Sequence, residues 1–199
     1  MKIENLTFNS SVYTCNAYLV TGDFNSMDDV NTLIDTGRDA KIIDRIWKAS
    51  TGVGKKRVEQ VIFTHNHYDH AGLIKEIKES FNSKFYAFSN SLEGIDVVLK
   101  GGERLKIGDR FFDIIYTPGH SSDSICLYNR EENVLFSGDT NLIIYSNDGT
   151  YEKKFVEILG KLADMNIKKI YPGHGNPIIK DCNEIINMSF KNVLQSKTL

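Results

Sequence analysis

The chain has 199 residues, of which 41% are hydrophobic and 25% are charged. This composition is typical of a globular protein with one sizeable core, so we expect a single domain over residues 1–199. The formal net charge is −2, with acidic and basic residues interspersed, which argues against nucleic acid or an anionic membrane as a partner. No segment approaches the ~18 apolar residues that a membrane-spanning helix needs.

The N-terminus and the cysteines bear on the cellular compartment. Residues 1–8 contain no uninterrupted apolar segment of the kind found in signal peptides. Cys15, Cys126 and Cys182 are an odd number of cysteines at wide spacing, and none belongs to a CxxC pair. We therefore expect a cytoplasmic protein with reduced thiols.

The first third of the chain is predicted to form strands and one helix. Residues 12–20 are rich in strand-forming side chains, and residues 30–34 would form the partner strand. The polar connection at 22–29 is either a simple turn or a flap over a pocket. Apolar residues at helical spacing predict an amphipathic helix over 39–49, and a strand at 58–63 follows it.

The remaining elements continue this alternation of strands and helices. Leu73, Ile74, Ile77 and Phe81 form one face of the next helix, and Asp181 is a candidate N-cap of the last one. Short strands are expected at 84–88, 95–99, 104–107, 110–116, 124–128, 133–136 and 168–171, and helices at about 151–165 and 181–195. Two strand-rich halves with helices suggest a layered α/β arrangement, with the helices outside two sheets.

The segment from Thr64 to His70 reads Thr-His-Asn-His-Tyr-Asp-His and directly follows an apolar strand. Three imidazoles and a carboxylate so close together pack poorly but suit a metal ion. His65 and His67 lie two residues apart, so a short turn can direct both rings towards one ion. Asp69 and His70 can then reach a second ion just beyond it.

The other two histidines lie in similar turns. His120 follows Pro118-Gly119, and His174 follows Pro172-Gly173. Because proline fixes φ and glycine allows unusual dihedrals, such turns can hold an imidazole in a set direction at the end of a strand. Asp139, in Ser137-Gly138-Asp139, also follows a strand.

Any one of these residues, taken alone, is more often a hydrogen-bonding or capping residue than a ligand. As a set they are harder to explain in that way, since all five histidines of the protein follow strands and three of them share one heptapeptide. Imidazole and carboxylate are the preferred ligands of zinc and related ions. The sequence therefore predicts a metal site.

With these residues the sequence resembles the metallo-β-lactamase fold superfamily of binuclear metallohydrolases. The matching features are the His-x-His-x-Asp-His run at 65–70, then His120, Asp139 and His174 in the same order. The segments at 16–20 and 33–37 are similar to the N-terminal strands of that family. The resemblance covers roughly residues 10–180 and implies an α/β fold, a four-layer αββα sandwich with the site at one edge between the sheets.

The resemblance also implies a set of ligands. His65, His67 and His120 would hold the first ion, while Asp69, His70 and His174 would hold the second. Asp139 would bridge the two ions. Two divalent metal ions are thus expected, zinc in the first place and iron or manganese as alternatives.

Such a pair of ions has a defined chemistry. Two divalent ions about 3.5–4 Å apart can share a water and lower its pKa towards neutrality, and the hydroxide attacks an electrophilic centre. Asp69 would orient this nucleophile and pass a proton to the leaving group as a general acid–base. Asp35, after a predicted strand, would support the ligand loop through hydrogen bonds or merely form a turn.

The substrate class is less sharply defined. Metallo-β-lactamases are usually exported and often place a cysteine in the second site, where this chain has none. The pattern is most similar to glyoxalase II-like thioesterases, but the chain stops about 25 residues after His174 and lacks the basic segment that usually follows the bridging Asp. We expect a small thioester, lactone or other acyl ester as substrate. Residues that would line its pocket, or simply lie at the surface, are Tyr68, Ser121, Asn141 and Tyr145.

Two other functions remain open. One is an oxidoreductase resembling the persulfide dioxygenases, which share the ligand run but use a single iron. The other is a metal-binding module without catalysis, although a decayed site would be expected to have lost ligands. The sequence makes no prediction about the oligomeric state.

Overall fold

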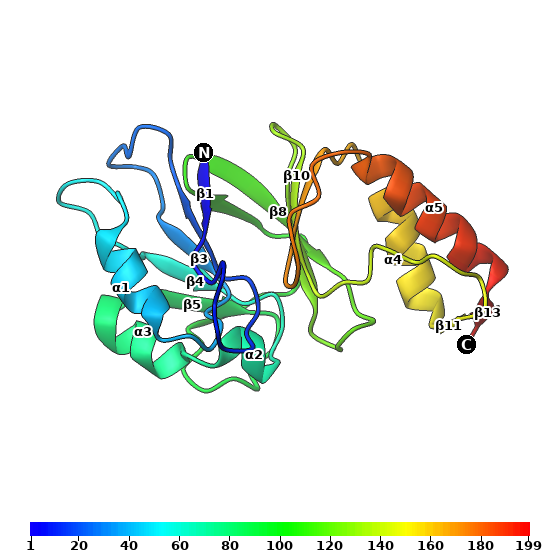
Figure 1. Cartoon of the computed structure of the whole chain (residues 1–199), viewed down its shortest axis with the longest axis horizontal. Helices are drawn as coiled ribbons and strands as arrows, with labels where there is room; N and C mark the ends of the chain where they lie inside the picture. The colour runs from blue at the N-terminus through cyan, green and yellow to red at the C-terminus, as the bar shows by residue number, and fades with distance from the viewer.

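The computed structural model describes all residues, 1–199, and contains two β-sheets that pack face to face, with helices on both outer sides (Figure 1). The first sheet has six strands in the order β1-β2-β3-β4-β5-β6, and the second has five in the order β12-β10-β9-β8-β7. This is the four-layer αββα sandwich that the sequence resemblance implied.

The first sheet is built from the N-terminal half of the chain. Its strands are β1 (Lys2–Asn5), β2 (Tyr18–Thr21), β3 (Thr32–Ile34), β4 (Gln60–Ile62), β5 (Lys84–Ala87) and β6 (Val97–Val98). β1, β2 and β3 are antiparallel neighbours, while β3 to β6 run parallel. The carboxyl ends of β3 and β4 therefore meet at one edge, where Asp35 and His65 follow them.

The second sheet comes from the C-terminal half. Its strands are β7 (Arg104–Ile107), β8 (Arg110–Tyr116), β9 (Ile125–Asn129), β10 (Val134–Gly138) and β12 (Lys169–Pro172). All neighbours are antiparallel except β10 and β12, which are parallel. A separate parallel pair joins β11 (Thr150–Tyr151) to β13 (Lys197–Thr198).

The helices cover the two outer faces. They are α1 (Lys41–Lys48), α2 (Tyr68–Ala71), α3 (Ile74–Phe81), α4 (Lys153–Ala163) and α5 (Cys182–Gln195). α1 and α3 pack on the first sheet, whereas α4 and α5 pack on the second (Figure 1). No helix is both long and apolar enough to cross a lipid bilayer.

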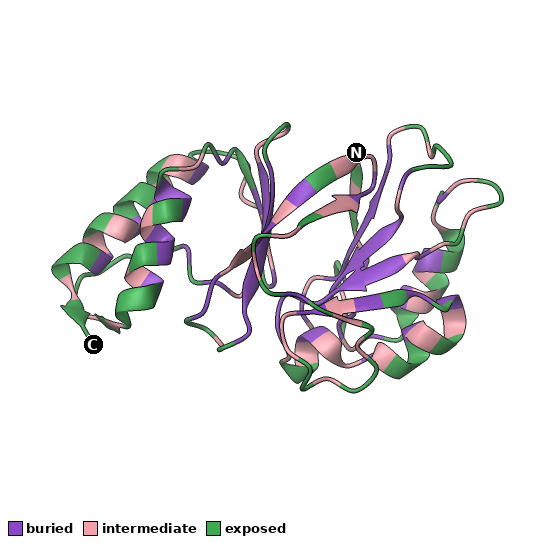
Figure 2. Ribbon diagram, turned by 180° about the vertical axis from the view of Figure 1, so that it is seen from behind, coloured by how far each residue is buried: buried purple, intermediate pink, exposed green.

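Three hydrophobic layers hold the sandwich together. Successive residues of a strand point to opposite faces, so Leu33 packs towards the first pair of helices and Ile34 towards the other sheet. Leu135 and Phe136 divide in the same way in the second sheet. Because both faces of the central strands are covered, the strands are largely buried (Figure 2).

Some local predictions were wrong. The expected strand at 12–20 is reduced to β2, because the backbone before it bonds to other loops: Cys15 N–H donates to Asp69 O and Asn16 N–H to Gly173 O. Asp69 and His70 lie on the short helix α2, for which the sequence analysis made no prediction. Asp181 is the N-cap residue of α5, but its side chain makes no capping hydrogen bond and its φ is 54°.

The flap interpretation of the 22–29 loop is also wrong. β2 begins near the edge that carries Asp35 and His65 and runs away from it, so the loop lies at the opposite edge of the sheet. There Asp23 contacts the Met1 amino group at 3.0 Å, and Lys106 Nζ donates to Asp28 Oδ2 at 3.0 Å.

We expect Phe136→Ala to lower the free energy of unfolding by about 3–5 kcal/mol, as measured by urea denaturation. The Phe136 side chain is 1% exposed, and its ring lies 5.4 Å from Tyr18 and 5.2 Å from Tyr171 in the layer between the sheets. The control is Phe24→Ala in the 22–29 loop, where the side chain is 90% exposed. It should change the free energy by no more than about 0.5 kcal/mol. Equal losses would contradict this account of the core.

Candidate metal centre

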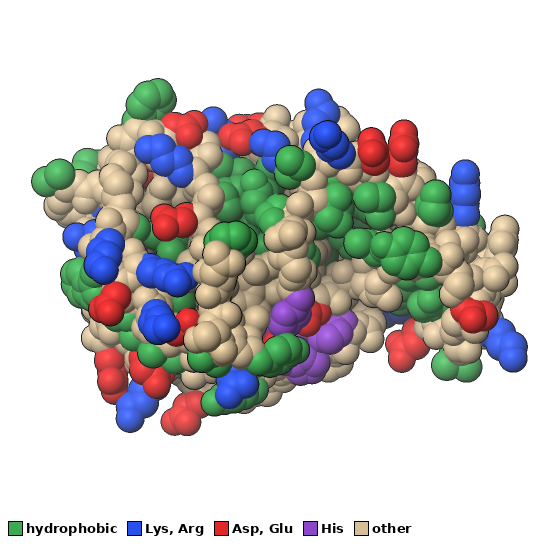
Figure 3. Space-filling model, viewed as in Figure 1, with side chains coloured by type: hydrophobic (Ala, Val, Ile, Leu, Met, Phe, Trp, Pro, Cys, Tyr) green, Lys and Arg blue, Asp and Glu red, His purple; other side chains and the backbone are tan.

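The histidines gather at one edge of the sandwich, where both sheets end. His65 follows β4, His120 follows β8, Asp139 follows β10 and His174 follows β12. α2 continues the loop after β4 and adds Asp69 and His70. Figure 3 shows histidine side chains together on the surface between the two halves of the molecule.

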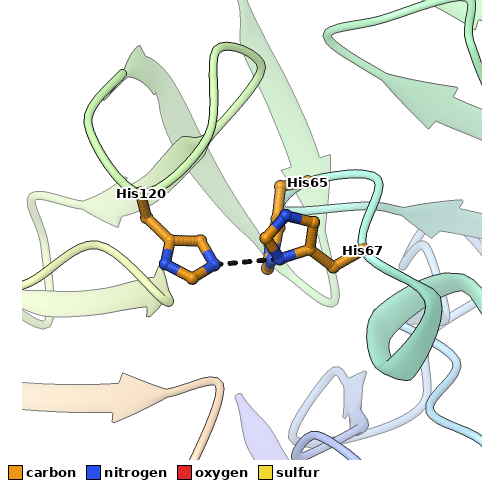
Figure 4. Close-up of side chains that lie close together, drawn as sticks. All are labelled: His65, His67 and His120. Atoms are coloured by element: carbon orange, nitrogen blue, oxygen red, sulfur yellow. Dashed lines mark hydrogen bonds between the residues drawn. The ribbon is translucent and has the colours of Figure 1, made fainter.

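The potential ligands form four sets of three whose ligand atoms lie within 4.8 Å of one another. Two of these sets are His65 with His70 and Asp139, and Cys15 with Asp35 and His70. The other two divide the site into two groups. One group is His65, His67 and His120, in which His120 Nε2 is 3.0 Å from His67 Nδ1 (Figure 4). The other is Asp69, His70 and His174, in which His174 Nε2 is 3.0 Å from Asp69 Oδ2. The structure thus brings together the same sets that the sequence assigned to two ions.

The Asp139 carboxylate lies between the two groups. Its Oδ2 is 3.5 Å from His120 Nε2 and 3.5 Å from His174 Nε2, and its Oδ1 is 3.3 Å from His70 Nε2. Gly138 positions this residue, because its φ is +50° and a Cβ there would lie 2.7 Å from the Thr64 side chain. The Asp139 carboxylate is therefore close to donor atoms of both groups.

Buried polar atoms at this point have no hydrogen-bond partner. They include His65 Nε2, His70 Nε2 and Asp139 Oδ1, all facing the same small region. An unsatisfied buried polar group costs about 1–3 kcal/mol, so three at one place call for an explanation. Imidazole nitrogen and carboxylate oxygen are suitable zinc ligands, and the residues present fit a metal ion.

The charges of His65, His120 and Asp139 suit metal binding as well. Burial lowers the pKa of His65 to about 4, so its ring is neutral near pH 7. Burial also lowers the pKa of His120, and the nearby Asp139 offsets only part of this effect. Burial alone would raise the pKa of Asp139, but the adjacent His70 holds it at about 2. Neutral imidazole and ionised carboxylate are the forms that bind metal.

Asp35 supports this edge through three hydrogen bonds. Its Oδ1 accepts from the Thr64 N–H at 2.8 Å, and its Oδ2 accepts from Thr64 Oγ1 at 2.8 Å and lies 2.8 Å from His70 Nδ1. Burial lowers the pKa of His70, but the Asp35 carboxylate more than offsets this and raises it above its usual value. The contact also directs His70 Nε2 towards Asp139, which is the supporting role considered for Asp35.

The site has a closed back and an open front. His65 and His70 are buried, whereas His67, His120 and His174 are exposed. A cavity of about 390 Å³ adjoins His120, Asp139 and His174. A second cavity of about 390 Å³ shares His120 and Asn141 with it and extends to Phe155 at the start of α4. Small molecules can therefore reach the exposed histidines.

The four predicted pocket residues have different surroundings. Asn141 lines both cavities. Ser121 Oγ donates to Asp123 Oδ1 at 2.7 Å and stabilises its own turn. Tyr68 is exposed, with the Arg38 guanidinium 4.4 Å from its ring centre, and Tyr145 lines a separate cavity beside α5. A pocket role for Tyr68, Ser121 and Tyr145 stays a prediction.

Sequence reasoning missed several residues at this site. Thr64 was read only as the start of the histidine run, although its hydroxyl links Asp35 to the ligand loop. Tyr13 was read as part of a strand, but its ring stacks on His174 at a centroid distance of 5.7 Å. Thr64 could have been suspected from its place beside His65. No local pattern distinguishes Tyr13, because the contact spans 161 positions of the chain.

Comparisons with known proteins agree with this geometry. The sequence model of the metallo-β-lactamase superfamily matches residues 11–91 and 84–174. A hydroxyacylglutathione hydrolase from Francisella tularensis subsp. novicida is 32% identical over 130 residues, which are 60% of this chain and 50% of that protein. The lactamase-like protein adaB from Aspergillus niger is 31% identical over 172 residues, 82% of this chain and 50% of that protein.

A solved structure resembles the whole chain in fold. ETHE1 from Myxococcus xanthus superposes with a TM-score of 0.69 at 20% sequence identity, covering 96% of this chain and 88% of that one. At this identity the likeness concerns the fold alone. The chain spans about half the length of the curated relatives named above.

Removal of metal should lower the melting temperature of the protein. An ion that binds only the folded state raises the free energy of unfolding. At a free concentration a thousandfold above its dissociation constant, the increase is about 4 kcal/mol. For a chain of this size that is about 8–16 °C between the zinc-loaded and the chelated protein in differential scanning calorimetry. A double variant with one exposed ligand removed from each group, His67→Ala with His174→Ala, should lose most of the shift. A full shift in that variant would place the metal elsewhere.

Asp35→Asn should weaken metal binding about 10–100-fold, measured by competition with a chromophoric chelator. An amide cannot accept hydrogen bonds on both of its ends, so Thr64 or His70 loses a partner. Asp44→Asn on the exposed face of α1 is the matched control and should leave the affinity unchanged. If both variants bind metal like the wild type, Asp35 forms only a turn.

Proposed function

The chain belongs to the metallo-β-lactamase superfamily, and we propose that it is a metal-dependent hydrolase that holds two divalent ions, with zinc as the first candidate. The observation that carries the proposal is the arrangement of two three-residue groups around the Asp139 carboxylate. A single binding group would serve one ion, and a loosely arranged set would leave Asp139 in contact with only one group.

Each group has a role in this proposal. His65, His67 and His120 would hold one ion, Asp69, His70 and His174 the other, and Asp139 both. When bound, the ions would polarise the bond to be cleaved and lower the pKa of a water between them towards neutrality. His65 and His70 are held by buried contacts, so the back of the site can keep its geometry during turnover.

Asp69 is the residue proposed to move the proton. Its Oδ2 lies 3.0 Å from His174 Nε2, and its side chain is 17% exposed at the open front of the site. A carboxylate in this place can accept a proton from the attacking water and donate it to the leaving atom. General acid–base catalysis of this kind contributes about 10²–10⁴ in rate.

The proposed substrate is a small thioester, lactone or other acyl ester. The cavity of about 390 Å³ at His120 and His174 lies within the usual range for small-molecule sites. Asn141 lines this cavity and its neighbour, and we propose that its side-chain amide bonds a substrate oxygen. The likeness to a hydroxyacylglutathione hydrolase supports the inclusion of thioesters among the candidates.

Asp69→Asn should lower kcat by a factor of about 10²–10⁴, because the amide cannot take up the proton. The assay is a screen of thioester, lactone and phosphodiester substrates on metal-analysed protein. Asp164→Asn, an exposed acid at the end of α4, is the control and should keep full activity. Unchanged turnover in Asp69→Asn would contradict the proposed acid–base role of Asp69.

Metal analysis of the same samples separates the other functions. Two ions per chain with ester or thioester hydrolysis supports the proposal. One iron per chain with oxygen uptake on a persulfide would replace it with an oxidoreductase. Bound metal without turnover on any of these substrate classes would favour the non-catalytic module.

A further inference from the structure

The segment from Tyr13 to Tyr18 lies across the edge of the sandwich and contacts both loops that carry the second group of ligands. Cys15 N–H donates to the backbone oxygen of Asp69 at 3.2 Å. The next residue, Asn16, donates its N–H to the backbone oxygen of Gly173 at 2.6 Å. Two successive amides thus join the Asp69 helix to the turn of His174.

The Asn16 side chain adds two further hydrogen bonds to that turn. Its Nδ2 donates to Pro172 O at 2.9 Å and to Gly175 O at 2.8 Å, so it bonds the backbone on both sides of His174. Its Oδ1 accepts from Asn5 Nδ2 at 2.8 Å, which fixes the orientation of the amide. The Asn16 side chain therefore bonds the turn through its Nδ2 group, while its Oδ1 is held by Asn5.

Two tyrosines of the same segment reinforce this contact. Tyr18 Oη donates to Pro172 O at 2.8 Å. Tyr13 stacks its ring on that of His174, with an angle of 18° between the planes. The His174 turn is thus held from the N-terminal segment, more than 150 positions away in the sequence.

The turn has little packing of its own to position it. A Cβ on Gly173 would lie 2.1 Å from Asp139 Oδ1 and 2.7 Å from His70 Cε1, so this position admits no side chain that could anchor the turn. The His174 side chain is 36% exposed and lies outside the hydrophobic layers. The Gly173 N–H donates to Gly138 O at 2.8 Å. The Tyr13–Tyr18 segment donates hydrogen bonds to the backbone oxygens of Pro172, Gly173 and Gly175.

The first group is supported differently. His65 is buried, and the carbonyl before it, Thr64 O, accepts from Ile125 N–H at 2.8 Å. His67 and His120 contact each other, and no hydrogen bond from the Tyr13–Tyr18 segment reaches any of these three histidines. Support from this segment is thus specific to the second group.

We propose that Asn16 is a positioning residue for the second metal ion, which acts by fixing the turn that carries His174. The inference rests on the proposed two-ion site. It states that Asn16, which is not itself a ligand, affects how tightly the second ion binds. Loss of the Asn16 amide frees the turn, so the second ion should be lost first and the first ion should remain.

The test compares metal affinity in wild type, Asn16→Ala and Asn129→Ala. Asn129 is a fully buried asparagine at the far end of β9 that donates to Phe111 O at 2.9 Å, so its loss costs stability without touching the site. Zinc is withdrawn with a chromophoric chelator, and the zinc remaining per chain is measured. In Asn16→Ala the affinity for one ion should fall about 10–100-fold and the other should stay unchanged. Asn129→Ala should keep both affinities.

A double-mutant cycle identifies the ion concerned. In the background of His174→Ala, which removes the residue that Asn16 positions, Asn16→Ala should have no further effect on zinc affinity. In the background of His67→Ala, where the second group is intact, Asn16→Ala should still lower the zinc affinity about 10–100-fold. Tyr18→Phe, which removes one of the bonds to Pro172, should show a smaller effect in the same direction.

The outcomes separate this inference from the proposed function. Two ions in the wild type with unchanged affinities in Asn16→Ala would overturn the positioning role alone. Equal weakening of both ions, or an effect that persists without His174, would also overturn it and leave a general structural role. A wild type that binds fewer than two ions under saturating zinc would overturn both proposals.

Discussion

The Asp139 carboxylate faces imidazole nitrogens from both sheets, and the arrangement of this edge depends on that contact. It lies 3.5 Å or less from His70, His120 and His174, so loops from distant parts of the sequence must converge within a few ångströms. Buried nitrogens and an oxygen without partners are unfavourable in themselves. The hydrophobic layers of the sandwich supply the stability that keeps them in place, as is common where a fold carries a functional site.

The buried and the exposed histidines are supported differently. His65 and His70 lie in the buried back, where Asp35 and Thr64 connect the ends of β3 and β4. The exposed His120 and His174 lie in turns that contain glycine, whereas the exposed His67 lies in the loop after β4. The His174 turn accepts hydrogen bonds from Asn16 and Tyr18, and residues 13–17 precede β2 and contact loops at this edge.

Much of the fold could be predicted from the sequence, because apolar periodicity and turn residues are local signals. The strand β8 and the helices α1 and α4 lie where the pattern placed them, within a few residues. The prediction of a strand at 12–17 was wrong for a physical reason. This segment is rich in strand formers, but its backbone bonds to loops and not to a neighbouring strand. Local patterns do not identify the partner of an extended segment. The sequence left open whether the loop at 22–29 covers a pocket, because its distance from the site depends on strand direction.

The sequence by itself determined the chemistry of the candidate site. His65, His67, Asp69 and His70 are close in any fold because the chain joins them, and the turns of His120 and His174 show their type in a few residues. Only the tertiary structure decided how closely these residues approach one another and which cavities adjoin them. It also decided the contacts of Asn16 and Tyr13, which cross more than 150 residues and depend on how the two sheets pack.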